Sequence, residues 1–384
     1  MEIIPYGKQF IDKNDTKLVV KSLSKNLITT GPFVEKFEKE IKKYLKSNFS
    51  FACSSGTAAI HLSMLALNLK KGDIILMPAI NFVSSYNMAK ILQLRIFLVD
   101  VDKNTGQMTP DHVIDCIKKN KLKNIKALVV MYHGGYPENS KEFFKLKIKF
   151  NFSIIEDACH ALGAEYEYKR SSYKIGSCKH SDICTFSLHP LKTITSGEGG
   201  VVTTNNPEIA KKIKMFRSHG IVRQKKKYWK YDVFENGFNY RLSDINCALA
   251  LTQLKKINFF LKKRKSIYKK YFKELQNFNP NLTIPIYSKS QISSYHLFLI
   301  QINFKDLKKK KDHFLKYLNQ HKIYAQYHYI PIYKFNIFKE KMTKFHGSEE
   351  YFSNSISIPI YVDLNINKQD KVINIIKNYL NKFS

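Results

Sequence analysis

TFSLHPLKTITSGEGGVVTTN, residues 185–205, contains two short apolar strands joined by a turn that carries Lys192 and a glycine-rich GEGG run. This arrangement is unusual for a lysine that serves only as a solvated surface charge. A lysine that forms a Schiff base needs a lowered pKa, which partial burial and neighbouring positive charge provide. Spacing alone still favours a solvated lysine, so the interpretation of Lys192 depends on the motifs that accompany it.

Apolar runs of the same kind recur through the first two-thirds of the chain and alternate with helical patterns. The predicted helices between them include residues 33–45, 56–69 and 139–150. The predicted strands are residues 73–79, 95–101, 126–133, 152–158, 182–188 and 199–205. Strands that are buried on both faces and connected by crossover helices predict an α/β fold with a mainly parallel, wound sheet.

This alternation stops near residue 243, where a single long helical pattern covers residues 243–276. The segments that follow are a strand at 295–304 and helices at 306–321 and 370–380. We therefore expect a smaller C-terminal α+β domain. The predicted domains are residues 1–255 and residues 256–384, in agreement with the two domains that 384 residues suggest.

The formal net charge of +33 has two interpretations. A lysine-rich surface binds nucleic-acid phosphates, and a regulatory DNA-binding protein is the rival class that this charge supports. The lysines are spread along the whole chain, however, without a zinc-finger, helix-turn-helix or RNP-type motif. We therefore expect no nucleic-acid partner, although a basic surface would also attract a nucleotide diphosphate.

The six cysteines are scattered and form no C-x-x-C pair. They predict reduced thiols and a cytoplasmic protein, and no apolar run predicts a membrane span. A metal enzyme using Cys159 and His160 with Cys178 or Cys184 is a further alternative. Since no ligand spacing matches a known type of metal site, we expect no metal.

Three stretches accompany the lysine turn. CSSGTAAIHL, residues 53–62, places Ser54, Ser55, Gly56 and Thr57 at the start of a helix, where backbone N–H groups bind phosphate. Taken alone, the same residues form an ordinary helix N-cap. Phe82 follows a strand end in MPAINFVSS, where it would stack on a planar ring or belong to the core.

The third stretch, FSIIEDACHALGA at residues 152–164, ends a buried strand in Glu156 and Asp157. Parallel sheets bind ligands beyond the carboxyl ends of their strands. A carboxylate there keeps a pyridinium nitrogen protonated, although Asp157 would equally serve as a helix N-cap. His160 would contact the ring hydroxyl or sit in a packed turn.

Together these stretches resemble the DegT/StrS family of sugar-nucleotide aminotransferases. These enzymes depend on pyridoxal phosphate and have the architecture called fold type I of pyridoxal-phosphate-dependent enzymes. The resemblance covers nearly the whole chain, from LITTGPFVEKFE through SSGTAAIHL, EDACHALGA and FSLHPLKTITSGEGG to GFNYRLSDINCALALTQL and AQYHYIPIY. Some family members have histidine in place of the lysine and catalyse dehydration. Because this chain retains Lys192, the resemblance implies amino transfer.

The resemblance implies a role for each matching residue. Lys192 would carry the cofactor and shuttle a proton, with Asp157 at the pyridine nitrogen and His160 near the ring oxygen. Phe82 would stack on the ring. The cofactor phosphate would be held by Gly56, Thr57, Ser187 and, from the partner subunit of a homodimer, Asn239. Substrate would be contacted by Tyr6, Asn26, Leu27, Ile28, Thr29, Gly56, Ser187, Asn239, His328 and Tyr329.

Within the family, the stretches CHALGAEY, FRSHGI, QLKK and AQYHYIPIY are most similar to transaminases of the pseudaminic acid pathway. This similarity implies transfer of an amino group from L-glutamate to C4 of a UDP-linked 4-keto-6-deoxy-N-acetylhexosamine. A dTDP- or GDP-linked sugar with a 3- or 4-keto group is the alternative substrate.

Overall fold

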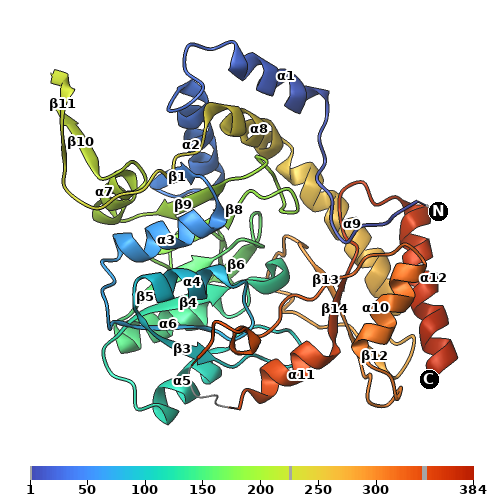
Figure 1. Cartoon of the computed structure of the whole chain (residues 1–384). Coiled ribbons are helices and arrows are strands. Elements are labelled where there is room, and N and C mark those ends of the chain that lie inside the picture. The colour runs from blue at the N-terminus through green and yellow to red at the C-terminus, as the bar shows by residue number, and fades with distance from the viewer. Residues whose placement is uncertain (1, 225–226, 340–343) are drawn as a thin grey trace.

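The computed structural model describes residues 2–224, 227–339 and 344–384. Its centre is a seven-stranded sheet with the strand order β1-β9-β8-β5-β4-β2-β3 (Figure 1). The α/β fold with a mainly parallel sheet is therefore confirmed, and all six predicted strands are present. The strands of this sheet are β1 (Phe49–Cys53), β2 (Ile74–Pro78), β3 (Arg95–Val99), β4 (Ile125–Met131), β5 (Ser153–Asp157), β8 (Ile183–Ser187) and β9 (Gly200–Thr204).

Strand β9 is antiparallel to both of its neighbours, whereas the strands from β8 to β3 are parallel. The reversal follows from the lysine turn, because β8 and β9 are joined directly and Ser187 pairs with Gly200. The turn therefore emerges at the carboxyl end of β8. Since Asp157 of β5 pairs with Thr185 of β8, this register brings Lys192 and Asp157 to the same edge of the sheet.

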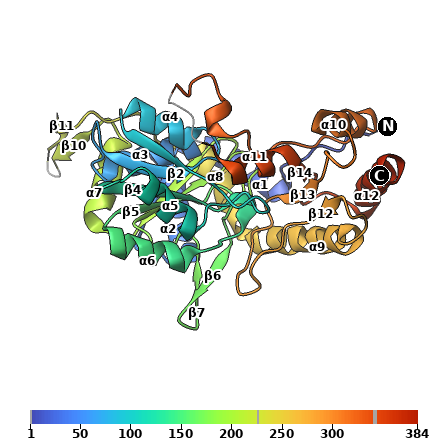
Figure 2. The ribbon, with the colours of Figure 1, turned by 90° about the horizontal axis from the view of Figure 1, so that it is seen from below.

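Helices cover both faces of the sheet (Figures 1 and 2). Helix α2 (Pro32–Leu45) packs on the sheet because it has one apolar side. Its residues Phe33, Phe37, Ile41 and Leu45 recur at helical spacing and are all buried. One face packs against α2, α5 (Pro110–Lys119), α6 (Ser140–Phe150) and α8 (Asp244–Lys255). The other packs against α3 (Gly56–Ala66), α4 (Ser84–Ile91) and α7 (Pro207–Phe216).

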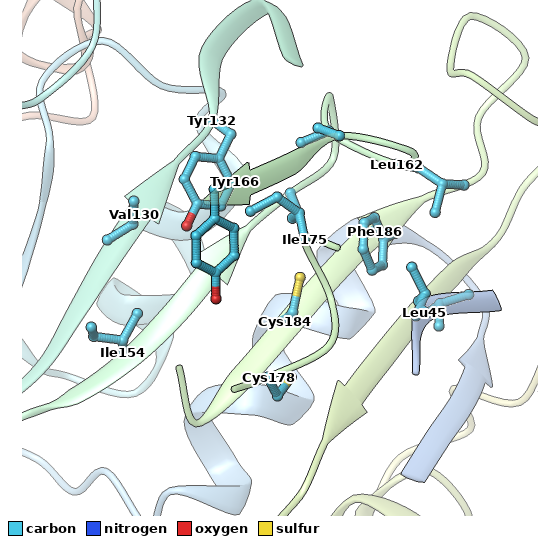
Figure 3. Close-up of a cluster of buried hydrophobic side chains, with 14 of the residues drawn as sticks. Leu45, Val130, Tyr132, Ile154, Leu162, Tyr166, Ile175, Cys178, Cys184 and Phe186 are labelled. Atoms are coloured by element: carbon cyan, nitrogen blue, oxygen red, sulfur yellow. The ribbon is translucent and has the colours of Figure 1, made fainter. Parts of the chain in front are cut away.

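Figure 3 shows part of the core on the first of these faces, where Cys178 and Cys184 lie among Ile175, Tyr166 and Phe186. Burial raises the pKa of the Cys178 thiol to about 12, so this side chain behaves as a small apolar group. In the described part of the chain, no group of three or more His, Cys, Asp or Glu side chains is arranged to hold a metal ion.

A second hydrophobic core lies in the C-terminal part of the chain and includes Ile4 from the N-terminus. Ile4 donates its backbone N–H to the Lys322 carbonyl (2.9 Å), which ties the first residues to this part. The proposed domain boundary at residues 255/256 stays a prediction. The elements here are α9 (Ile257–Leu275), β12 (Leu282–Thr283), β13 (Phe298–Ile302), α10 (Lys311–Gln320), α11 (His346–Asn354), β14 (Ser355–Ile358) and α12 (Ile366–Phe383).

Several predicted boundaries in this region were wrong. The helix expected over residues 243–276 is two helices, α8 and α9, because Lys256 between them is not helical (φ −97°, ψ 2°). The helix expected from residue 306 begins at Lys311, since Lys308 has a left-handed backbone (φ 50°). The final helix is longer than expected because Asn365 caps it at the N-terminus.

Two hairpins that the sequence did not predict project from the body of the molecule. β6 (Glu165–Tyr168) and β7 (Ser171–Lys174) form one, which is clearest in Figure 2. β10 (Ile221–Gln224) and β11 (Lys227–Val233) form the other, at the upper left of Figure 1. Helix α1 (Lys13–Leu23) packs on α8. Within the described residues, every helix is too short or too polar to cross a membrane.

Candidate active site

A cavity of about 380 Å³ lies at the carboxyl edge of the central sheet, where the lysine turn emerges. Ten of the predicted site residues line it, and they come from segments that are far apart in the sequence. The lining residues are Tyr6, Ser55, Gly56, Thr57, Phe82, Ser84, Met131, Asp157, Cys159, His160, Ser187, His189, Leu191, Lys192, Glu198, His296, His328 and Tyr329.

The start of α3 forms one wall of this cavity. Ser55 is the N-cap and its hydroxyl accepts from the Ala58 N–H (3.0 Å), so the ordinary capping interpretation is correct for Ser55. The helix begins at Gly56, and Gly56 and Thr57 line the cavity beside Ser187. A Cβ at position 56 would lie only 2.9 Å from the Ser187 Cβ. Glycine therefore lets the helix terminus approach β8 closely, which leaves a positive helix end facing the cavity.

Asp157 is the last residue of β5 and is only 2% exposed. Its carboxylate accepts from the Ser85 hydroxyl (3.4 Å) and from the Cys159 N–H (3.3 Å). It caps no helix, because the residues after it form turns. None of the salt bridges among the described residues involves Asp157. A buried carboxylate without a salt-bridge partner is costly, and this one faces a cavity that holds Lys192 and can admit a positively charged ligand.

Lys192 lies in the turn between β8 and β9, where its N–H donates to the His189 carbonyl (2.9 Å). Burial lowers the pKa of its ammonium group, and the nearby Cys159 and Asp157 oppose that shift. A lowered pKa increases the fraction of neutral amine, which is the nucleophilic form. Lys192 is thus a half-buried amine in a cavity with a carboxylate, rather than a solvated surface lysine.

Histidines and tyrosines form another part of the cavity lining. His160 Nε2 lies 2.8 Å from the Tyr329 hydroxyl, and the His160 and His296 rings lie 4.2 Å apart. Burial lowers the pKa of His160, His296 and His328 well below the usual value, so these rings are neutral at neutral pH. The lining contains no other lysine and no arginine among the described residues. Phe82 is 52% exposed and its ring lies 5.8 Å from that of Tyr329.

His296 was not predicted from the sequence. It lies two residues before the buried strand β13, and a histidine next to a strand start carries no pattern that marks it as part of a site. His133 was missed for the same reason, since it follows β4 in a short 3₁₀ turn (His133–Gly135).

Five predicted site residues do not reach this cavity within the single chain. Asn26, Leu27, Ile28 and Thr29 are exposed, and the Ile28 carbonyl accepts from the Asp244 N–H (3.0 Å). Asn239 is also exposed and pairs with Ser218 in an isolated bridge. Their role in substrate or cofactor binding stays a prediction.

The sequence profile of the DegT/DnrJ/EryC1/StrS aminotransferase family matches residues 9–377. The chain belongs to this family. It is 36% identical over 368 residues to a UDP-4-amino-4,6-dideoxy-N-acetyl-beta-L-altrosamine transaminase of Campylobacter jejuni, covering 95% of this chain and 94% of that protein. It is also similar to the structure of Helicobacter pylori PseC, an aminotransferase involved in the biosynthesis of pseudoaminic acid. That match has a TM-score of 0.91 and 28% identity, with all of both chains covered.

Membership of an aminotransferase family confirms the expected enzyme class over that of a regulatory DNA-binding protein. The family implies pyridoxal phosphate as the cofactor. A putative sugar aminotransferase from Streptococcus pneumoniae, solved in its PLP form, shares the fold with a TM-score of 0.89, 22% identity and full coverage of both chains.

The cavity of this chain fits that cofactor. Asp157 is a buried carboxylate with no salt bridge to any described residue, and Lys192 has a lowered pKa. The start of α3 and Ser187 supply donors for a phosphate, in space that a Cβ at position 56 would reduce.

Proposed function

We propose that this chain transfers an amino group from L-glutamate to C4 of a UDP-linked 4-keto-6-deoxy-N-acetylhexosamine. The observation that carries the proposal is the meeting of Lys192 and Asp157 in one cavity, in a chain similar along 95% of its length to a UDP-sugar transaminase. A dTDP- or GDP-linked 3- or 4-keto sugar is the alternative substrate.

The predicted site residues that line the cavity each have a part in this proposal. Pyridoxal phosphate, when bound, supplies an electron sink for negative charge at the substrate carbon. Lys192 would hold it through its Nζ, and the same nitrogen would move a proton at the substrate carbon. Asp157 would keep the pyridine nitrogen protonated, His160 would contact the ring oxygen and Phe82 would stack on the ring.

The cofactor phosphate and the diphosphate of the nucleotide sugar would be bound by different residues of the cavity. The cofactor phosphate is assigned to the start of α3 at Gly56 and Thr57, and to the Ser187 hydroxyl. The nucleotide sugar is assigned to the side formed by Tyr6, His328 and Tyr329. The rings of Tyr6 and His328 lie 5.6 Å apart.

The active protein in this proposal is a homodimer. Asn239 and residues 26–29 are exposed in the single chain, so they are available to a neighbouring copy. The cavity also has no lysine besides Lys192, and no arginine, among its described lining residues. A diphosphate and the carboxylates of glutamate need additional cations, which we expect the second copy to provide.

We also place the enzyme in the cytoplasm. All six cysteines are free thiols and five of them are buried, as is typical of proteins in a reducing compartment.

The substrate is tested by incubating the holoenzyme and L-glutamate with UDP-4-keto, dTDP-4-keto and dTDP-3-keto sugars. NMR then assigns the carbon that gains nitrogen. We expect turnover of the UDP-linked 4-keto-6-deoxy-N-acetylhexosamine with amination at C4. Exclusive use of a dTDP-3-keto sugar would overturn the substrate and leave the aminotransferase class intact.

Sharing of the site between subunits is tested by complementation. Lys192→Ala and Asn239→Asp variants are each expected to be inactive, the second because it places a carboxylate near the cofactor phosphate. After subunit exchange, random mixing gives hybrid dimers with one intact site, and up to roughly a quarter of wild-type activity should return. If Asn239 serves the site of its own chain, no hybrid has an intact site and no activity returns.

A further inference from the structure

The hydrogen bonds of His160 fix which of its nitrogens carries the proton. The Gly134 N–H donates to His160 Nδ1 (3.4 Å), so Nδ1 is the bare acceptor nitrogen. Burial lowers the pKa of this ring well below the usual value, and the neutral ring carries one proton. That proton therefore lies on Nε2, which donates it to the Tyr329 hydroxyl oxygen at 2.8 Å.

This assignment leaves the hydroxyl proton of Tyr329 without a partner in the described part of the chain. The oxygen already accepts from His160, and Tyr329 lines the cavity, so the proton is directed towards a ligand there. Burial raises the pKa of Tyr329 well above its usual value, so the hydroxyl stays protonated over the whole physiological range. Tyr329 thus presents a neutral O–H donor to whatever occupies the cavity.

A second tyrosine, Tyr351, contacts the backbone of the segment at residues 328–329. Tyr351 of α11 is 1% exposed and does not line the cavity. Its hydroxyl donates to the carbonyl of His328, the residue before Tyr329, at 2.8 Å. Because the Tyr351 hydroxyl proton is already donated to His328, the Tyr351 oxygen can only accept in its second bond, and it accepts from His133 Nε2 at 2.7 Å. Burial lowers the pKa of His133 to about 3, so this ring is a fixed neutral donor.

The Tyr351 ring has little freedom to move. A Cβ at Gly106 would lie 2.5 Å from the ring, which shows how closely the backbone packs against it. The backbone at position 328 is therefore anchored to α11, and with it the direction of the Tyr329 side chain. Both the anchor and the donor are single hydroxyl groups that phenylalanine removes without changing the ring.

We propose that Tyr329 donates a hydrogen bond to the carbonyl oxygen of the keto substrate, and that Tyr351 is the residue that positions it. This inference rests on the proposed function, in which each substrate brings a carbonyl to the same place. A carbonyl oxygen gains negative charge when nitrogen attacks its carbon, and a preorganised donor stabilises that charge. Tyr329 keeps its proton throughout, so no covalent step is assigned to it.

The test compares Tyr329→Phe, Tyr351→Phe and the double variant with Tyr333→Phe as a matched control. The Tyr333 hydroxyl also joins this segment to α11, by donating to Glu349 (2.8 Å), but Tyr333 lies outside the cavity. Holoenzyme loaded with an amino group is mixed in single-turnover experiments with 2-oxoglutarate or with the UDP-4-keto sugar. Absorption spectra of the bound cofactor and melting temperatures are recorded for every variant.

We expect Tyr329→Phe to slow the reaction with both keto substrates by roughly 10²-fold, the scale for loss of one oxyanion donor. Tyr351→Phe should slow it by about tenfold, in line with a modest displacement of that donor. The double variant should be no slower than Tyr329→Phe, because Tyr351 acts through Tyr329. Tyr333→Phe should react at the wild-type rate, and the cofactor spectra should be unchanged.

Different results overturn different parts of the inference. Wild-type rates in Tyr329→Phe would remove the donor role. A double variant slower by the product of the two single effects would remove the positioning role of Tyr351. An altered cofactor spectrum in Tyr329→Phe would assign the hydroxyl to the cofactor instead. A wild type that reacts with 2-oxoglutarate but not with the sugar contradicts the proposed substrate, while the 2-oxoglutarate rates still test Tyr329.

Discussion

Replacing Lys192 by alanine is expected to abolish both turnover and the visible absorption of covalently bound pyridoxal phosphate. Two functions would be lost together, because in the proposed mechanism the same Nζ binds the cofactor and moves the proton at the substrate carbon. Loss of a positioned acid–base group alone lowers a rate by roughly 10²–10⁴-fold, and loss of the covalent attachment adds to this. The measurement is an absorption spectrum of the purified protein together with a glutamate-dependent turnover assay.

Lys211→Ala is the matched control for this prediction. Lys211 is an exposed lysine of α7, and its removal should leave both the spectrum and the turnover at wild-type values. Full transaminase activity in Lys192→Ala would show that another amine carries out the chemistry. The assignment of the cavity as the active site would then be wrong.

Changing Asp157 to asparagine is expected to lower turnover by roughly 10²-fold or more, as when one electrostatic catalytic group is removed. Asparagine has nearly the same shape but no charge, so it cannot keep the pyridine nitrogen protonated. The electron sink is weakened while the packing around β5 is retained. Single-turnover rates with L-glutamate measure the effect directly.

Glu156→Gln provides the control for Asp157, because Glu156 is the preceding residue of the same strand and points to the opposite face of the sheet. Its carboxyl group accepts from the Tyr132 hydroxyl (2.8 Å), away from the cavity, and burial raises its pKa. A glutamine side chain also accepts this bond, so turnover should be unchanged. Equal rates in Asp157→Asn and wild type would mean that a different carboxylate faces the cofactor.

The sheet was predictable from the sequence because its strands are buried on both faces and therefore stand out as apolar runs. Strand β1 (Phe49–Cys53, FSFAC) was missed, since Ser50 interrupts its apolar run and the strand leads directly into the turn before α3. The break at Lys256 was also hidden, because its neighbours on both sides favour helix and a single non-helical residue leaves the apolar pattern intact.

The centre of the site was predictable for a related reason. Asp157 ends one buried strand and Lys192 follows its neighbour, and the carboxyl ends of parallel strands meet at one edge. His133, His296 and Tyr351 were not predictable, because tertiary packing alone brings them beside His160 and the segment at 328–329. Asn239 does not line the cavity of its own chain, and its predicted role depends on a second copy.

The most direct test of the account is to identify the lysine that carries the cofactor. The holoenzyme is treated with borohydride, which reduces the bond between the cofactor and its lysine to a stable amine, and the protein is digested and analysed by mass spectrometry. We predict that the modification lies on Lys192 in the peptide that contains residues 185–191, and that L-glutamate added before the borohydride prevents it. Modification of any other lysine, or labelling of Lys192 that glutamate does not affect, would contradict the account.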